Sequence, residues 1–219
     1  IFVRELVSNA IDATQKLKTL SSIGEAKGDI GELRIDVKLD TEKKTLTISD
    51  RGVGMTAEEI DKYLNQLAFS GAEEFLEKYK GQNENNIIGH FGLGFYSAFM
   101  VSDKVEVFSK SFREGARAVR WECDGSPEFT LEEVEKDVRG TDIVLHINEE
   151  SKEFLDSYRI EAILQKFCRF LPVPIYFKNE NEKPVELKEG ETAPEEKSIN
   201  NPTPAWTKKP SELTDEDYI

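Results

Sequence analysis

The chain has 219 residues, of which 38% are hydrophobic and 33% are charged, and its formal net charge is −14. This length is enough for one domain with a substantial core, or for one domain followed by a tail. The negative charge argues against a nucleic-acid partner, because such a surface needs a basic stripe. No apolar run approaches the roughly 18 residues of a membrane-spanning helix, so we expect no membrane partner. The two cysteines, Cys123 and Cys168, lack CxxC spacing and predict reduced thiols in a cytoplasmic protein.

The first twenty residues predict one amphipathic helix. Its apolar side chains recur at steps of four and three: Leu6, Ala10, Ala13, Leu17 and Leu20. A polar stripe lies beside them: Glu5, Asn9, Asp12 and Lys16. At about 100° per residue these four positions lie within roughly 60° of one another, at the edge of the buried face. From this helix alone, two interpretations of the stripe remain. It is either the solvent-exposed edge of the buried face or a row of polar groups that lines a cleft.

The rest of the chain predicts hairpins with helices between them. Alternating apolar residues indicate strands at 33–40, 45–50, 104–110, 116–123, 128–134, 141–147 and 174–178. Thr56 followed by Glu59 is the signature of a capping box, and it opens a helix at Ala57. A long helix is expected over 152–171. This order predicts an α+β fold, a two-layer sandwich of a mostly antiparallel twisted sheet with helices on one face.

Two glycine motifs stand next to these elements. Asp50-x-Gly52-x-Gly54 ends a strand, where Asp followed by Gly is also common in ordinary turns. Gly89-His90-Phe91-Gly92-Leu93-Gly94 precedes an apolar helix, where glycines expose backbone N–H groups that bind phosphate readily. The second motif is neither a dinucleotide fingerprint nor a Walker P-loop, and a flexible turn also explains it.

Together the motifs resemble those of one family. The segments FVREL-SNA-DA, SDRGVGM, GHFGLGFYSAFMV and RGTDIVLHI are similar to the N-terminal ATPase domain of the heat-shock-protein-90 chaperones. Through them the chain resembles the ATPase superfamily of gyrase, histidine kinases and MutL. The resemblance covers nearly the whole chain. It implies a molecular chaperone that binds and hydrolyses ATP, with ADP and Mg²⁺ as further ligands, to drive conformational cycling on client proteins.

The resemblance also implies roles for single residues. Glu5 is the general base, and Asn9 holds the Mg²⁺ that bridges the phosphates. Asp50 accepts a hydrogen bond from the adenine amine, with help from Thr141 through water. Two further residues, Gly54 and Met55, line the adenine pocket. The phosphates are wrapped by the glycine motif and the residue after it: Gly89, His90, Phe91, Gly92, Leu93, Gly94 and Phe95.

The segment from about Gln66 to Phe95 is implied to be a mobile lid, and it departs from the family pattern. It is shorter than usual, and Phe69 stands where the family has a lysine, so any nucleotide contact by that lysine is lost. Either Asn65 or Gln66 occupies the nucleotide-binding position of a family asparagine. The role of Asp12 is left open.

The domain organisation follows from composition and from the family. We expect an ATP-binding domain over 1–178, an acidic linker over 179–201 and the start of a middle domain over 202–219. Because Ile1 opens inside a helical pattern, we expect the domain's own N-terminal segment to be missing. The full-length protein is expected to be a homodimer. A histidine-kinase-like enzyme and a gyrase- or MutL-like enzyme remain as alternatives, and the net charge disfavours the latter.

Overall fold

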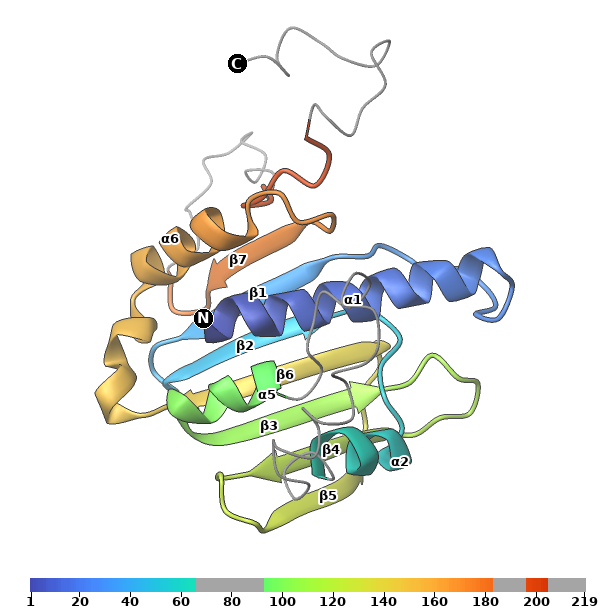
Figure 1. Ribbon diagram of the computed structural model, residues 1–219, viewed down its shortest axis with the longest axis horizontal. Helices are drawn as coiled ribbons and strands as arrows, with labels where there is room; N and C mark the ends of the chain where they lie inside the picture. The colour runs from blue at the N-terminus through green and yellow to red at the C-terminus, as the bar shows by residue number, and fades with distance from the viewer. Residues whose placement is uncertain (66–92, 183–195, 205–219) are drawn as a thin grey trace, which may run out of the picture.

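The computed structural model describes residues 1–65, 93–182 and 196–204. Within these ranges the protein forms a two-layer sandwich with helices on one face of a single sheet (Figure 1). Several expectations lie outside the described residues, namely most of the lid, most of the acidic linker and the start of the middle domain beyond Pro204. No helix in the described part of the chain is long and apolar enough to cross a membrane.

The sheet has seven strands in the order β5-β4-β3-β6-β2-β1-β7. The strands are β1 (Ile35–Asp40), β2 (Thr45–Asp50), β3 (Ser102–Lys110), β4 (Ala118–Cys123), β5 (Phe129–Val134), β6 (Gly140–Ile147) and β7 (Ile175–Asn179). All neighbouring pairs are antiparallel except β1 and β7, which run parallel. The prediction of a mostly antiparallel sheet is therefore confirmed.

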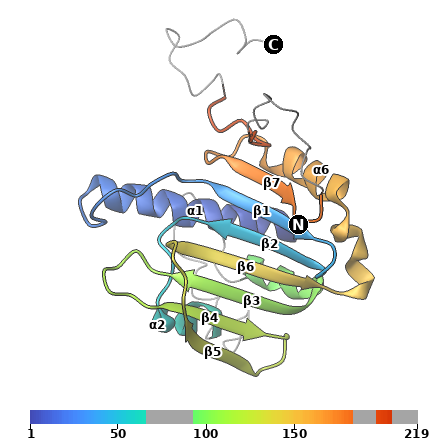
Figure 2. The same cartoon turned by 180° about the vertical axis from the view of Figure 1, so that it is seen from behind.

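The helices cover one face of this sheet and leave the other open (Figure 2). They are α1 (Phe2–Ser22), α2 (Ala57–Ile60), a π-helical turn (Asp61–Asn65), α5 (Leu93–Tyr96), a 3-10 turn (Ser97–Met100) and α6 (Ser157–Cys168). The long helix α1 packs across β1 and β2, and α6 packs beside α1. The capping box at the start of α2 is present, because the Thr56 and Glu59 side chains each bond the other's backbone N–H.

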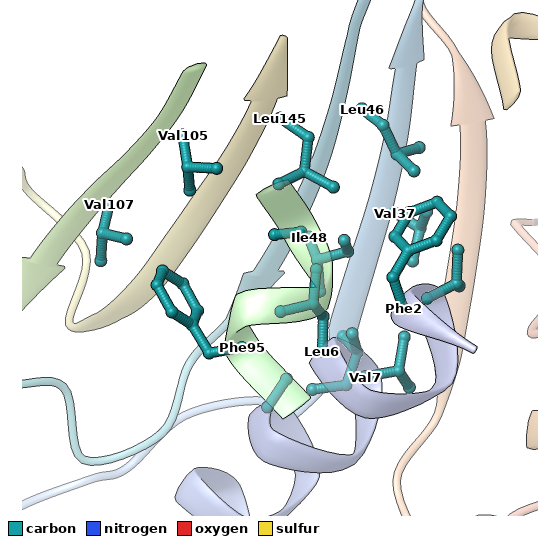
Figure 3. Packing of buried hydrophobic residues seen from close by; sticks show 14 of the residues in the cluster. Phe2, Leu6, Val7, Val37, Leu46, Ile48, Phe95, Val105, Val107 and Leu145 are labelled. Atoms are coloured by element: carbon teal, nitrogen blue, oxygen red, sulfur yellow. The ribbon is translucent and has the colours of Figure 1, made fainter. Parts of the chain in front are cut away.

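The core lies between α1 and the sheet. Leu6 and Val7 of α1 are fully buried, and they lie over Ile48 of β2 and Val37 of β1 (Figure 3). Phe95 of α5 fills the space beyond α1 and makes an edge-to-face contact with Trp121, with ring centroids 5.9 Å apart. Burying an aliphatic side chain such as that of Leu6 or Val7 contributes about 1.5–3 kcal/mol to the free energy of unfolding. These buried side chains therefore hold α1 on the sheet.

One expected helix is divided in two. The segment predicted as a single helix over 152–171 consists of a 3-10 helix (Glu149–Leu155) followed by α6. The break lies at Asp156, whose backbone is extended and whose carboxylate accepts the N–H of Arg159 as an N-cap. An Asp with its side chain bonded to the backbone three residues ahead favours a helix start over a helix interior.

Ile199 and Asn200 lie beside the start of the edge strand β7. The Asn200 side chain is 5% exposed, accepts the Ile175 N–H at 2.8 Å and donates to the carbonyls of Leu171 and Val173. The backbone N–H of Ile199 also bonds the Ile175 carbonyl at 2.8 Å. Asn200 therefore satisfies backbone groups at the start of β7, and the domain boundaries expected near residues 178 and 201 stay predictions.

The burial along α1 leads to a stability prediction. Leu6→Ala should lower the free energy of unfolding by about 2–5 kcal/mol, because the fully buried site leaves a cavity. Leu20→Ala, the same change at a half-buried position of the same helix, should cost clearly less. Urea unfolding of both variants measures the difference. Equal losses would contradict the placement of Leu6 in the core.

Candidate functional site

The polar stripe of α1 lies at the edge of the core. Glu5, Asn9 and Asp12 are half-buried and Lys16 is exposed, so the first three hold the intermediate position that the sequence predicts. Burial raises the pKa of Asp12 above its usual value. No side-chain hydrogen bond or ion pair joins Glu5 or Asn9 to the residues that the structure describes. Within the described part of the chain, the polar atoms of both side chains therefore have no protein partner.

Glu5 meets the end of the glycine motif. A Cβ atom added to Gly94 would lie 2.8 Å from the Glu5 carboxylate oxygen, so the Glu5 side chain would have to shift to admit it. The contact places the Glu5 side chain against the backbone at the start of α5. The preceding residues of the motif, 89–92, lie outside the described structure. Leu93 begins α5, and Phe95 is a core residue.

The turn after β2 packs closely between two other elements, α1 and the end of β3. A Cβ on Gly52 would lie 2.5 Å from the carbonyl carbon of Ala13 in α1, and the Val53 N–H bonds the Ala13 carbonyl at 3.2 Å. Gly54 has φ +59°, and its Cβ would lie 1.9 Å from the Lys110 carbonyl at the end of β3. The two glycines of the DxGxG motif are thus required for close backbone packing. This turn holds α1 and β3 at a fixed distance from Asp50.

Arg139 fixes the same turn from the side of β6. Its guanidinium donates to the carbonyls of Arg51 at 3.0 Å, Gly52 at 3.1 Å and Ile30 at 2.7 Å. Burial lowers the pKa of Arg139, and the charge of Asp50 opposes this change. We did not predict Arg139 as part of the site. The only signal in the sequence was its place in the RGTD segment, next to Thr141.

Asp50 is the buried acid of the site. It is 7% exposed, and its Oδ1 accepts the Gly52 N–H at 2.7 Å. Burial raises its pKa to about 7, assisted by the charge of Asp142, while the N–H groups of Gly52 and Thr141 and the charge of Lys136 act in the opposite direction. A carboxyl group with this pKa exists in both protonation states near neutral pH. The site therefore offers a strong but pH-sensitive hydrogen-bond acceptor.

A chain of hydrogen bonds runs from β6 to the turn. The Thr141 and Ser109 hydroxyls are 2.8 Å apart, and the Met55 N–H donates to the Ser109 hydroxyl at 2.8 Å. Thr141 and Ser109 are cross-strand partners on the buried face of the sheet. The structure therefore brings the predicted residues Asp50, Thr141 and Met55 together. Ser109 was not predicted, although it continues the buried alternation of Val105 and Val107.

The other predicted residues divide into three groups. Gly54 joins the Asp50 cluster, and Asn9 lies one turn of α1 beyond Glu5. Asn65 ends the π-helical turn, but its side chain is outside the described structure, so the question of Asn65 or Gln66 stays open. In the described residues, no three His, Cys, Asp or Glu side chains gather as a metal-binding group.

The raised pKa of Asp50 predicts how stability changes with pH. The folded chain binds this proton more tightly than the unfolded chain, so the group lowers the free energy of unfolding as pH rises from 3.8 to about 7. Asn stays neutral, so Asp50→Asn should be the more stable protein at pH 8, by on the order of 2–4 kcal/mol. The two proteins should converge near pH 4.

Denaturant unfolding of both proteins across this pH range measures the difference directly. The other titrating groups are the same in both proteins, so their contributions cancel in the difference between the two free energies of unfolding. Stability curves that stay parallel from pH 4 to pH 8 would contradict the burial of an ionisable Asp50.

The chain is similar in sequence to several known chaperone proteins. The chain is 66% identical over 218 residues to the chaperone protein HtpG of Bacteroides fragilis, covering 100% of this chain and 31% of that protein. It is 61% identical to HtpG of Porphyromonas gingivalis and 42% identical to HtpG of Pseudoalteromonas translucida. The chain thus spans about a third of the length of these relatives. Residues 2–143 match the family model described as histidine kinase-, DNA gyrase B-, and HSP90-like ATPase, and the chain therefore belongs to this ATPase family.

Proposed function

We propose that the chain is the ATP-binding domain of an ATP-dependent molecular chaperone and that its site binds ATP and ADP. The observation that carries the proposal is the buried Asp50 carboxyl, held by backbone N–H groups beside a glycine turn. A buried acid without a bonded cation is costly unless a ligand uses it. Family membership supports a nucleotide as that ligand.

The Asp50 cluster is proposed to hold the adenine base. The carboxylate of Asp50 accepts the exocyclic amine, and Thr141 assists from the neighbouring strand through a water. Gly54 and Met55 bring the backbone of the turn against the ring, where a larger residue at Gly54 would clash with Lys110. Such a set of buried polar groups discriminates strongly, because a base that leaves them unpaired loses affinity.

The polar stripe of α1 is proposed to act on the phosphates. Asn9 has a neutral amide oxygen without a partner among the described residues, and oxygen donors of this kind suit Mg²⁺. A bound Mg²⁺ supplies charge neutralisation to the phosphates. The glycine motif 89–94 and Phe95 wrap the phosphates through backbone N–H groups, with the segment from about Gln66 to Phe95 as the lid.

Glu5 is proposed to be the general base for hydrolysis. Its carboxylate lies against Gly94, the last glycine of the phosphate-binding motif, and no described cation pairs with it. An unpaired carboxylate in this position takes the proton of a water that attacks the terminal phosphate. Asp12 lies further along the same face of α1, where burial raises its pKa, and it has no assigned role in this proposal.

The larger functions concern the full-length protein. The relatives are named chaperone proteins. We propose that the protein carrying this chain acts in the cytoplasm on client proteins during the stress response, as a homodimer, without nucleic-acid or membrane partners. These names favour the chaperone over the histidine-kinase-like and gyrase- or MutL-like alternatives. Refolding of a denatured enzyme by the full-length protein, with and without ATP, tests the chaperone function, and ATP-independent refolding would count against it.

The role of Asp50 is tested by ADP binding. A hydrogen bond to a charged group contributes about 1.5–3 kcal/mol, so Asp50→Asn should weaken ADP binding about 10- to 100-fold. Asp156→Asn is the matched control, because Asn keeps the N-cap of α6 far from the site. Calorimetric titration with ADP and Mg²⁺ measures both. If Asp50→Asn bound ADP with wild-type affinity, the assignment of Asp50 to the nucleotide site would be wrong.

Variants of Glu5 and Asn9 should differ in how they change ATP affinity and the rate of hydrolysis. Asn9 acts in the ground state, so Asn9→Ala should weaken ATP binding and slow hydrolysis together. Glu5 acts only in the transition state, so Glu5→Ala should leave ATP affinity unchanged or slightly higher and slow hydrolysis by about 10²–10⁴. The measurements are ATP affinity and single-turnover rate in the full-length protein. If Glu5→Ala lost affinity in proportion to rate, Glu5 would be a binding residue.

A further inference from the structure

Arg139 reaches the site through three backbone carbonyls. Its Nε and Nη2 atoms both donate to the Arg51 carbonyl, at 3.3 and 3.0 Å. Nε also donates to the Gly52 carbonyl at 3.1 Å, and Nη2 to the Ile30 carbonyl at 2.7 Å. A guanidinium carries only donors and a carbonyl only accepts, so the direction of each hydrogen bond is determined. In the part of the chain that the structure describes, no carboxylate forms an ion pair with Arg139.

One of these carbonyls belongs to the peptide group that also binds Asp50. The Arg51 carbonyl and the Gly52 N–H are the two polar ends of a single peptide group. That N–H donates to Asp50 Oδ1 at 2.7 Å. The described chain has no cis peptide bond, and in a planar trans peptide the C=O and the N–H point in opposite directions. The Arg139 guanidinium and the Asp50 carboxylate therefore bond opposite ends of the same peptide group.

This arrangement makes the two hydrogen bonds cooperative. A cation that bonds a carbonyl oxygen polarises the peptide group and makes the N–H of that group a stronger donor. A stronger N–H donor favours the negative carboxylate over the neutral carboxyl group, because hydrogen bonds to a charged acceptor are the stronger ones. The charge of Arg139 thus favours ionised Asp50 without an ion pair between the two side chains.

The two residues after Arg139 hold the same turn. A Cβ atom on Gly140 would lie 2.0 Å from the Asp50 carbonyl oxygen, and the Thr141 N–H bonds the Asp50 carboxylate. We propose that Arg139 is a positioning residue that acts through the peptide group between Arg51 and Gly52 to hold Asp50 as an ionised acceptor for the nucleotide. The inference rests on the proposed nucleotide site and adds the residue that prepares its acceptor.

Other charges also act on Asp50 and set the pH range of a test. Burial raises the pKa of Asp50 to about 7, the charge of Asp142 raises it further and the charge of Lys136 lowers it. Lys136 and Asp142 form an ion pair at 2.6 Å, so their effects on Asp50 offset each other in part. Further charged side chains on the neighbouring elements are Asp12 of α1, Arg51, which pairs with Glu32 and Asp36, and Lys110, which bonds the Asp137 carbonyl.

The first test measures the coupling without nucleotide. Arg139→Gln removes the charge and keeps an amide donor. Ionised Asp50 is the form that destabilises the folded chain, and without the cation this form is less favourable still. The equilibrium constant for unfolding in urea should therefore rise about 3- to 10-fold more at pH 8 than at pH 5, relative to wild type. An equal rise at both pH values would show a structural brace only and would overturn the inference.

The second test is ADP affinity as a function of pH. Without the cation, Asp50 ionises at a higher pH, so Arg139→Gln should bind ADP about 3- to 10-fold more weakly than wild type at pH 6.5. At pH 9 the carboxyl group is ionised in both proteins, and the affinities should agree within about twofold. The phosphates of ADP titrate identically with both proteins, so their contribution cancels in the ratio. Equal losses of affinity at pH 6.5 and pH 9 would contradict the proposed role.

Two further variants are the controls. Arg139→Lys keeps the charge but lacks the planar fork, so its ADP affinity at pH 6.5 should lie between those of wild type and Arg139→Gln. Arg117→Gln removes the same charge from an exposed ion pair with Glu133, and it should keep the wild-type pH dependence in both measurements. A wild-type chain that bound no ADP would overturn the proposed nucleotide site, while a pH-dependent unfolding difference would still support the coupling of Arg139 to Asp50.

Discussion

The site depends on the backbone contacts that hold the turn after β2. At Gly52 the turn touches α1, at Gly54 it touches the end of β3, and at Gly140 the start of β6 touches Asp50. At each of these places the space for a Cβ atom is already filled by backbone. Arg139 adds hydrogen bonds to the carbonyls of the same turn. These contacts hold the backbone on three sides, and the Gly52 N–H bonds the Asp50 carboxylate, so both favour the buried position of this side chain.

This constraint connects stability with function. Burying Asp50 raises its pKa to about 7, so its ionised form destabilises the empty protein at and above neutral pH. In the proposed complex, the same ionised form is the stronger hydrogen-bond acceptor for an adenine amine. The site is thus less stable than a neutral one, and binding of a ligand with a donor group at that position relieves the cost. Functional sites commonly contain such groups, because pKa shifts of this kind come from burial in a preformed pocket.

The strands of the fold could be predicted because the alternation of buried and exposed residues is visible within each short segment of the sequence. Alternation placed Leu46 and Ile48 on the inner face of β2, and the same alternation continued to Asp50 at the end of the strand. The division of the expected long helix was missed, since the N-cap at Asp156 lies within a pattern that is helical on both sides. Arg139 also escaped prediction, because its partners are more than eighty residues away in the sequence.

The site was predictable only in part. Glu5, Asp50 and Thr141 stand in motifs with a fixed order along the chain, and a resemblance can transfer their roles. Ser109 stands in no motif, and it became visible only when the register of β3 and β6 placed it opposite Thr141. A contact of this kind depends on how the two strands pair, and the sequence of either strand alone does not contain that register.

The most direct test of the account is the number of protons released when ADP binds. Calorimetry near pH 6.5 in buffers of different ionisation enthalpy measures this number, with wild type beside Asp50→Asn at an ADP concentration that saturates both. If the adenine amine binds the ionised carboxyl of a group whose pKa is about 7, wild type should release a fraction of a proton and Asp50→Asn should release almost none. Tight binding with the same proton release in both proteins would contradict the central claim.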